Sequence, residues 1–212
     1  NVNIPLVSLA APTVTDVEAR SDGVYLTFSK YMDEDTLTAT GAFQINGTNA
    51  TVTLLNSEQA PANINYQGGT APSYPSQVKL VMDETLSGEV TVAIANTVVS
   101  YAGVPCGSRT VSGMVQEGTL TVEEPEVQGT TGQVEYGATV TLTVPKGATV
   151  YYTTDDSVPT FDDNGQPTGT TIRYYEGQPI VITKTMTLKA VAVKYGVRSE
   201  MVPATFTVSG TG

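Results

Sequence analysis

The chain contains no histidine and no tryptophan, only one cysteine, and only 15% charged residues among its 212. Without histidine, the Ser-His-Asp and Cys-His arrangements and the common zinc sites are excluded. The single thiol, Cys106, rules out an internal disulfide, and no histidine is present to activate it as a nucleophile. We therefore interpret Cys106 as a small apolar residue in a Gly/Pro-containing turn.

Basic residues are also scarce, and the formal net charge is −11. Residues 1–122 hold 11 acidic and 4 basic side chains, and residues 123–212 hold 10 acidic and 6 basic ones. Neither half offers the basic patch that neutralises phosphates. Nucleic acid and anionic membrane surfaces are therefore poor partners, whereas divalent cations and neutral ligands such as glycans remain open.

Long hydrophobic runs are absent as well. No stretch approaches the roughly 20 apolar residues of a membrane span, so we expect no membrane insertion. Residues 4–12 are apolar, but they are too short a run, and no charged region precedes them as it would in a signal peptide. Because the chain begins at Asn1 without Met, we expect a processed or excised piece from which an export signal has been removed.

Short alternating runs recur along the first half, as in a β-sandwich. Val24, Leu26 and Phe28 alternate with polar residues, which predicts a strand with one buried face. Further strands are predicted at residues 42–45, 51–54, 78–82, 90–94 and 119–122. Asn46-Gly47 predicts a type I′ hairpin turn. We prefer this turn chemistry to glycosylation at the two acceptor patterns, Asn46-Gly47-Thr48 and Asn49-Ala50-Thr51.

Two segments interrupt these strands. Asp33-Glu34-Asp35 is interpreted as the first turn of a helix or a solvated loop, with a cation site as the minority alternative. Residues 57–77 form a Pro/Gly/Ser/Asn-rich insert that carries Tyr66 and Tyr74. We interpret the insert as a tolerated surface insertion, and a functional loop is the alternative.

Glu123-Glu124-Pro125 separates two sets of strands and predicts a domain boundary. The predicted domains are residues 1–122, in which residues 1–11 are a leading segment, and residues 123–212. Strands of the second domain are predicted around residues 126–127, 140–144, 150–154, 171–175, 179–183, 187–194 and 204–208. That number of strands is typical of a fibronectin or immunoglobulin sandwich. We therefore predict an all-β chain of two tandem immunoglobulin/fibronectin-like β-sandwiches.

The sequence of the first half resembles that of the bacterial Ig-like domain of S-layer and other surface proteins. The resemblance covers about residues 12–110 and rests on a strand ending in Phe-Ser-Lys, a Met-Asp pair, a Thr-Leu segment, a Phe strand and a closing turn. In this sequence they are Phe28-Ser29-Lys30, Met32-Asp33, Thr36-Leu37, Phe43 and Tyr101-Ala102-Gly103. The resemblance implies a sandwich domain of a surface protein.

The second half is similar to the Fn3-like C-terminal domain of chitobiases and β-hexosaminidases, over most of residues 125–208. The matching residues are Tyr151-Tyr152-Thr153-Thr154-Asp155, Ser157, Pro159-Thr160, Thr187-Leu188-Lys189-Ala190, Gly196 and Ser199. The sequence departs from the family pattern at one position, where it has Asp156 in place of the usual Gly. The resemblance implies an accessory module without catalytic residues, so the enzymes' activity is not carried over to this chain.

The most acidic stretch of the second half is a candidate calcium site. Five side chains with oxygen atoms follow one another within ten residues, and Ca²⁺ takes 6–8 oxygen ligands. They are Asp155, Asp156, Asp162, Asp163 and Asn164. The pattern is not an EF-hand, since Arg173 stands in the place of the closing acid. The alternative, which we prefer, is that these side chains stabilise turns through their own backbone.

Tyrosine pairs are the candidate glycan site. Tyr151-Tyr152 and Tyr174-Tyr175 are adjacent on predicted strands, so one member of each pair points outward. We select Tyr151 and Tyr174 as candidates for stacking on a sugar ring. The alternative, which we prefer, is that one tyrosine of each pair lies in the core and the other covers the sheet.

Together these observations predict a non-catalytic structural spacer or binding module of an exported, secreted or cell-surface bacterial protein. No cofactor other than calcium is predicted, and the predicted partners are a cell-surface glycan or another surface protein. An alternative is a carbohydrate-binding accessory region of a glycan-processing enzyme whose catalytic domain lies outside this chain. A third possibility is an adhesion or assembly module that binds another protein.

Overall fold

The computed structural model describes residues 9–59, 73–163 and 165–209. It divides into two compact units, Asn1–Thr119 and Leu120–Gly212, here named unit 1 and unit 2. Almost every regular element is a strand, which confirms the all-β fold class. In the described part of the chain, no helix has the length and apolar character of a membrane span. The predicted boundary after residue 122 stays a prediction.

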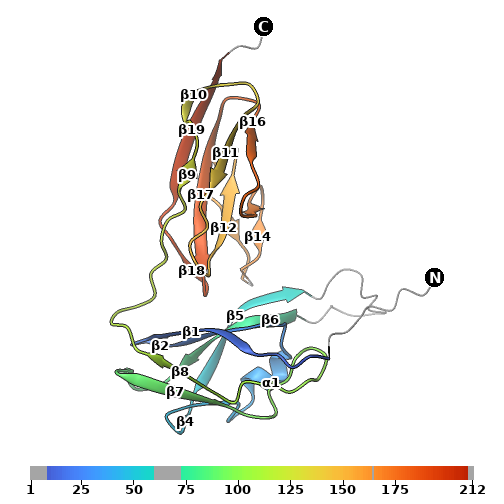
Figure 1. Cartoon of the computed structure of the whole chain (residues 1–212), viewed down its shortest axis with the longest axis vertical. Coiled ribbons are helices and arrows are strands. Elements are labelled where there is room, and N and C mark those ends of the chain that lie inside the picture. Colours follow the sequence, from blue (N-terminus) through green and yellow to red (C-terminus); the bar gives the residue numbers. More distant parts are fainter. Residues whose placement is uncertain (1–8, 60–72, 164, 210–212) are drawn as a thin grey trace, which may run out of the picture. The chain divides into compact units, whose positions relative to one another are not determined.

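Unit 1 is a sandwich of two four-stranded sheets (Figure 1). The first sheet has the order β1-β2-β6-β5, with bounds Val14–Arg20, Gly23–Phe28, Ser73–Val81 and Thr51–Gln59. The second has the order β4-β3-β7-β8, with bounds Thr48–Asn49, Phe43–Ile45, Glu89–Ile94 and Thr110–Met114. This arrangement is that of a constant-type immunoglobulin domain, with β4 added at one edge.

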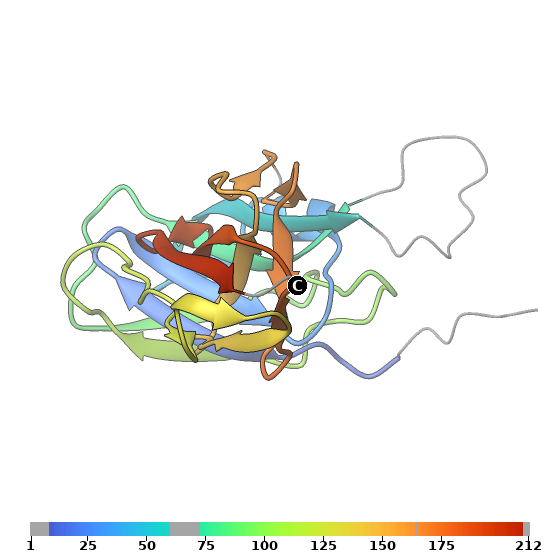
Figure 2. The same cartoon turned by 90° about the horizontal axis from the view of Figure 1, so that it is seen from above.

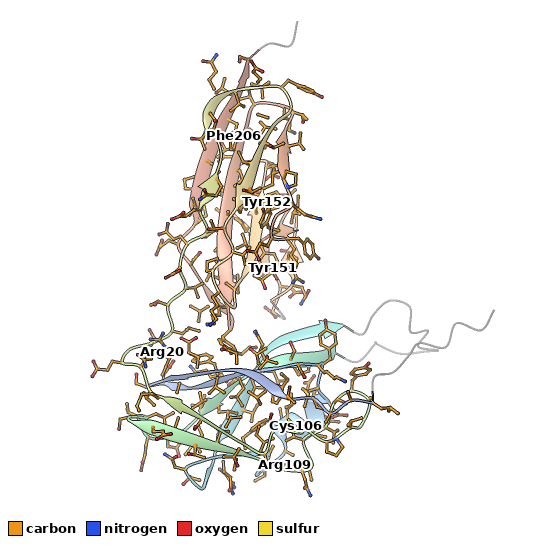
Figure 3. The ribbon with its side chains drawn as sticks, in the orientation of Figure 1. Arg20, Cys106, Arg109, Tyr151, Tyr152 and Phe206 are labelled. Atoms are coloured by element: carbon orange, nitrogen blue, oxygen red, sulfur yellow. The ribbon has the colours of Figure 1, made fainter. Side chains whose placement is uncertain are left out.

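Alternation along β2 places one face of the strand in the core of unit 1, as its sequence predicts. Strands β1 and β2 run side by side, drawn in blue in both overall views (Figure 1, Figure 2). Val24, Leu26 and Phe28 point into the core and pack with Phe43 of the opposite sheet. Cys106 is buried in the same core (Figure 3), where burial raises the pKa of its thiol. It is therefore a small core residue, in agreement with the sequence.

Local signals of unit 1 are confirmed at two turns. Helix α1 spans Glu34–Thr38, and the Asp33 carboxylate caps it by accepting a hydrogen bond from the Thr36 amide at 3.2 Å. Asn46 and Gly47 have φ angles of 50° and 85°, as a type I′ turn requires. The Asn46 side-chain oxygen accepts a hydrogen bond from the Thr91 amide at 2.9 Å.

Two predictions for unit 1 are wrong. Residues 119–122 form no strand, and the last strand of the unit is instead β8, where no strand was predicted. At Gly113 a larger residue would fit only tightly, because an added Cβ would lie 3.3 Å from the Val17 side chain of β1. The insert at 57–77 is also shorter than predicted, since β5 and β6 extend into it. The rest of it, with Tyr66, lies outside the described residues.

Unit 2 has a main sheet of order β10-β19-β17-β12-β15, with β18 added on β17. Its bounds are Gly132–Glu135, Val202–Ser209, Met186–Lys194, Thr149–Thr153 and Ile172–Tyr174, and β18 is Val197–Arg198. A second sheet, β16-β11-β9, comprises Ile180–Ile182, Ala138–Leu142 and Val127–Gln128. A small hairpin joins β13 (Thr160–Phe161) to β14 (Pro167–Thr168).

The core of unit 2 lies between these two sheets (Figure 3). Phe206 of β19 is fully buried there, together with Val150 of β12 and Leu142 of β11. Strand β10 pairs with β19 in parallel. The strands that come first and last in the sequence of the main sheet therefore lie side by side at one of its edges. Each unit therefore buries its own apolar core.

Candidate functional site

The acidic turn after β12 is organised by hydrogen bonds to Asp155. The Asp155 carboxylate accepts hydrogen bonds from the Ser157 hydroxyl and from the Ser157 amide, the latter at 3.2 Å. The hydroxyl bond from Ser157 is the largest cause of a pKa of about 2 for Asp155, and a hydrogen bond from Thr170 is the next. A carboxylate with so low a pKa stays ionised at neutral pH, which is the opposite of what a general acid requires.

Asp156 occupies a backbone conformation that favours glycine. Its φ is 67°, in the left-handed region that Asp and Asn tolerate better than other residues with side chains. This geometry explains why glycine is usual at the same point of the family pattern. The Asp156 carboxylate also lies 2.9 Å from the Lys189 ammonium, which donates to the Asp156 carbonyl at 2.6 Å.

The other predicted calcium ligands lie in the β13–β14 hairpin. One oxygen of Asp162 accepts a hydrogen bond from the Gln166 amide at 2.8 Å, and the Gly165 amide donates to the Asp162 carbonyl at 3.0 Å. Asp163 is exposed, and Asn164 lies outside the described residues. Within the described ranges, no three acidic or cysteine side chains converge on a point where a metal would bind.

Calcium binding at this turn stays a prediction. The hydrogen bonds of Asp155 and Asp162 are the turn-stabilising bonds that the sequence offered as the alternative. A rise in the melting temperature with millimolar Ca²⁺, abolished by Asp155→Asn or Asp162→Asn, is the result that the calcium site predicts. No shift in the unmodified chain would contradict it.

The tyrosine pairs are divided between the core and the surface, but not as predicted at the second pair. Tyr152 packs against the core of unit 2, and Tyr151 of β12 points to the other side of the sheet (Figure 3). Tyr174 is 4% exposed, whereas Tyr175 is 55% exposed. The outward orientation predicted for Tyr174 is therefore wrong, because Tyr174 pairs with the core residue Val150 across β12 and β15. Glycan binding at the tyrosine pairs stays a prediction.

Tyr151 is half-buried because the β13–β14 hairpin lies against it. The Tyr151 and Phe161 rings meet edge to face, with their centroids 4.9 Å apart. Tyr174, on the core side, meets Tyr152 edge to face at 6.2 Å, and burial raises the pKa of Tyr152. Of the two residues selected from the sequence, only Tyr151 is placed where a ligand can reach the sheet.

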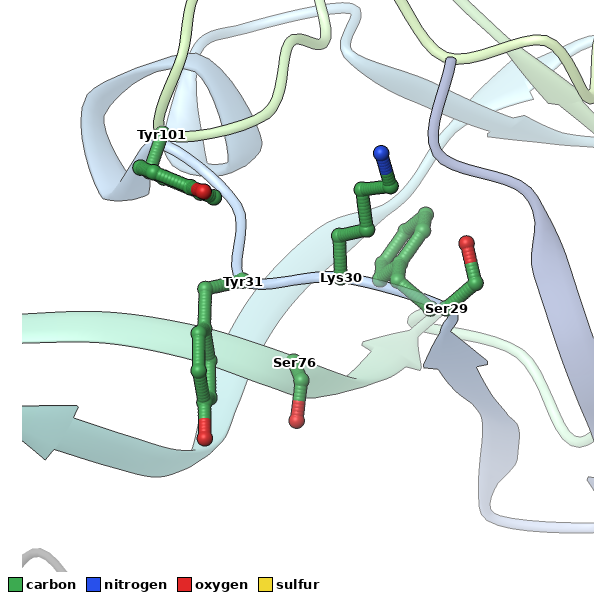
Figure 4. Close-up of a pocket in the computed structure, with 6 residues that line it drawn as sticks. Ser29, Lys30, Tyr31, Ser76 and Tyr101 are labelled. Atoms are coloured by element: carbon green, nitrogen blue, oxygen red, sulfur yellow. The ribbon is translucent and has the colours of Figure 1, made fainter. Parts of the chain in front are cut away.

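Unit 1 holds a pocket that the sequence analysis did not select as a site. It has a volume of about 420 Å³, within the usual range for small-molecule sites. Its lining consists of three aromatic residues, two serines and one lysine: Phe28, Tyr31, Tyr101, Ser29, Ser76 and Lys30. Tyr31 and Ser76 point to the same side of the strands, and Lys30 points the other way (Figure 4).

Four of these residues belong to the Phe-Ser-Lys and Tyr-Ala-Gly motifs of the bacterial Ig-like pattern, and these motifs are the sequence signal from which the pocket could have been found. The Lys30 ammonium donates a hydrogen bond to the Ala10 carbonyl at 2.6 Å. The Ser29 hydroxyl accepts one from the Thr13 amide at 2.9 Å. Both motif side chains therefore anchor the segment that leads into β1, and their first role is structural.

Residues 129–204 match the sequence model of the family described as the chitobiase/beta-hexosaminidase C-terminal domain. No curated protein matches the chain. One similar solved structure is the N-terminal part of the bacterial S-layer protein SbsC, with 16% identity, 93% of this chain and 44% of that chain covered, and a TM-score of 0.33. Another is the S-layer protein rSbsC(31-844), with 16% identity, coverages of 94% and 26%, and a TM-score of 0.35.

Tandem Ig repeats of Dlar are also similar, with 10% identity, coverages of 94% and 98%, and a TM-score of 0.23. TM-scores at this level carry no argument, so the fold is taken from the strand order of each unit. The chain spans less than half the length of the S-layer chains it matches. Unit 2 carries a domain that matches the chitobiase/β-hexosaminidase C-terminal domain family, as its motifs predict.

Proposed function

We propose that this chain is a non-catalytic module, a spacer or a binding module, of an exported bacterial cell-surface protein. The observation that carries the proposal is that each unit is a sandwich with its own buried core. A domain with its own core can fold by itself and be joined to others through a linker, as a spacer or a binding module requires. The bacterial Ig-like motifs of unit 1 support the same location at the cell surface.

The chemistry of the acidic turn supports a non-catalytic role. Asp155 is held ionised by hydroxyl and amide donors of its own turn, and Asp156 is paired with Lys189. Both carboxylates therefore stabilise the acidic turn to which they belong. The matched family takes its name from a domain at the C-terminal end of glycan-processing enzymes, which supports an accessory role for unit 2.

A second candidate is a carbohydrate-binding accessory region of an enzyme whose catalytic domain lies outside this chain. Exposed Tyr175 and half-buried Tyr151 favour it, because tyrosine combines a flat apolar ring with a polar tip. A glycan array with the full chain separates the two candidates. Retention that is lost in both Tyr151→Ala and Tyr175→Ala favours carbohydrate binding, and no retention favours a spacer.

The full reading frame of the gene tests the proposed location. We expect it to encode an export signal before Asn1 and further domains of a surface protein. A frame that adds a glycan-processing catalytic domain would favour the second candidate. A frame without any export signal would contradict both the cell-surface and the secreted location.

A further inference from the structure

One side of the main sheet of unit 2, here named the outer face, carries the side chains that point away from the core. Tyr151 of β12 lies opposite Val191 of β17 and Arg173 of β15. Arg198 of β18 lies opposite Val193, two residues after Val191 on the same strand. Directly opposite residues, and residues two apart on one strand, point to the same side of a sheet. Arg173 and Arg198 therefore lie on the same face as Tyr151.

Both arginines of the outer face lie over aromatic rings. The Arg173 guanidinium lies 5.0 Å from the centroid of the Tyr175 ring. The Arg198 guanidinium lies 4.5 Å from the centroid of the Phe161 ring, which itself contacts Tyr151 edge to face. The face thus presents a row of two arginines and three aromatic rings.

The cation–π contacts leave the N–H donors of each guanidinium without an acidic partner. An arginine over an aromatic ring is attracted to the ring face by its charge, and it carries five N–H donors that can bind a carboxylate. Both arginine side chains are exposed, and within the described residues neither makes an ion pair or a hydrogen bond to a carboxylate. The rings hold the guanidiniums in place without using the donors that recognise a carboxylate in a bidentate fashion.

The spacing of the two arginines fits an extended ligand. Val193 pairs with Thr149 on one side and with Arg198 on the other, so the strand order across the face is β15, β12, β17 and β18. Three strand spacings, about 14 Å in total, therefore separate Arg173 from Arg198 across the sheet. A ligand that reaches both arginines has to carry at least two anionic groups and to cross the rings of Tyr151 and Phe161.

We propose that the outer face of unit 2 binds a glycan that carries carboxylate groups, with Arg173 and Arg198 each binding one carboxylate and the tyrosine rings packing against the sugar rings. Charge complementarity at this face supports the ligand, because Arg173 and Arg198 are exposed cations without a carboxylate partner among the described residues. The chain as a whole has a net charge of −11 and repels anions, so binding of an anionic glycan depends on these two arginines. The inference rests on the proposed non-catalytic role and gives it a ligand class.

The test is a calorimetric titration of the full chain with a hexamer of galacturonic acid. The controls are the methyl ester of the same hexamer, which lacks the charges, and a hexaglutamate peptide, which lacks the sugar rings. We expect binding of the acid hexamer and no measurable binding of either control. No binding of the acid hexamer at millimolar concentration, or equal binding of hexaglutamate, would overturn the proposal.

Three variants locate the site. We expect Arg173→Gln and Arg198→Gln each to raise the Kd about tenfold or more, the effect of losing one charge-assisted bidentate contact. Lys184→Gln is the matched control, since it removes one positive charge from the exposed turn between β16 and β17 of the same unit, and we expect a change of less than about twofold. Melting temperatures of all three variants verify folding. Equal losses in all three, or none in the arginine variants, would contradict the site.

The outcome for the ligand is separable from that for the proposed function. If the hexamer does not bind, the inference fails and the spacer role stands. If the hexamer binds and is shortened during the titration, as seen by mass spectrometry, the site stands and the non-catalytic role fails.

Discussion

The two units each place a basic residue over a tyrosine ring on the outer side of a sheet, but they complete the arrangement differently. In unit 1, Lys79 lies opposite Tyr25 and its ammonium is 5.2 Å from the ring centroid. Asp22 then pairs with Lys79 at 2.8 Å, and this hydrogen bond is the main cause of a raised pKa for Lys79. In unit 2, Arg173 lies opposite Tyr151, and its guanidinium lies over the Tyr175 ring, with no such acid among the described residues.

The difference indicates which of these cations is available to bind a ligand. The positive charge of Lys79 is satisfied within unit 1 by Asp22, from the turn between β1 and β2. The guanidiniums of unit 2 are positioned by rings, which contribute contact area but no negative charge. An external carboxylate at Arg173 would therefore take the place that Asp22 takes in unit 1.

The largest effect tests whether the units fold separately. Phe206 and Phe43 are each fully buried in the core of their own unit. We expect Phe206→Ala to destabilise unit 2 by about 3–5 kcal/mol and Phe43→Ala to do the same for unit 1. Calorimetry of the full chain should then show one transition lowered and the other unchanged in each variant. A common shift of both transitions would contradict separate cores.

The next effect tests the left-handed residue of the acidic turn in unit 2. Asp156 has a φ of 67°, which a β-branched side chain adopts only with strain. We expect Asp156→Val to cost about 1–3 kcal/mol of stability, measured by urea unfolding of the full chain. Asp156→Gly is the control and should lie within about 0.5 kcal/mol of the unmodified chain, since relief of strain offsets loss of the Lys189 pair. Equal costs in both variants would show that the ion pair, and not the backbone, matters.

A smaller effect sharpens the comparison of the two cations. Asp22→Asn removes the charge that faces Lys79, and we expect a loss of about 1 kcal/mol in the stability of unit 1, measured by urea unfolding. Arg173→Gln, which breaks no pair with a described acid, should cost less than that in unit 2. If Arg173→Gln proves the more destabilising change, the outer face is a structural layer and the cations of the two units do not differ in their availability to a ligand.

The smallest effect is a pH dependence that belongs to unit 2. The pKa of Asp155 is lowered to about 2 in the folded chain, so its ionised form stabilises folding at pH values above its ordinary pKa near 4. This contribution is lost as the pH falls from about 4 to about 2. The melting temperature of Asp155→Asn should lie below that of the unmodified chain at pH 6, and the difference should shrink as the pH falls through about 4 toward 2. A difference that is independent of pH would contradict the charge-based cause.

Signals that act over a few residues were sufficient for much of the fold. The Asn46-Gly47 turn, the helical turn at Asp33-Glu34-Asp35 and the alternation of Val24, Leu26 and Phe28 are all confirmed, because each depends on neighbours in the sequence. Strand β8 was not predicted. Gly113 of this strand packs closely against β1, and no local sequence pattern reveals such a contact.

The candidate site depended on contacts between distant residues, and for that reason the sequence predicted only part of it. Tyr174 and Tyr175 follow one another, and only the pairing of β15 with β12 decides which of them is exposed. Phe161 and Arg198 are 37 positions apart and meet only because the β13–β14 hairpin lies over the main sheet. The outer face is therefore visible in the structure and absent from any short motif.

A nuclear magnetic resonance titration of the full chain with the galacturonic acid hexamer tests the central contrast most directly. The side-chain N–H signals of Arg173 and Arg198 and the ammonium of Lys79 report on the three cations in one experiment. We predict saturable shifts of both arginine signals and of Tyr151, with Lys79 unchanged because Asp22 already occupies it. Shifts at Lys79 equal to those at the arginines, or no shift at either arginine, would contradict the account.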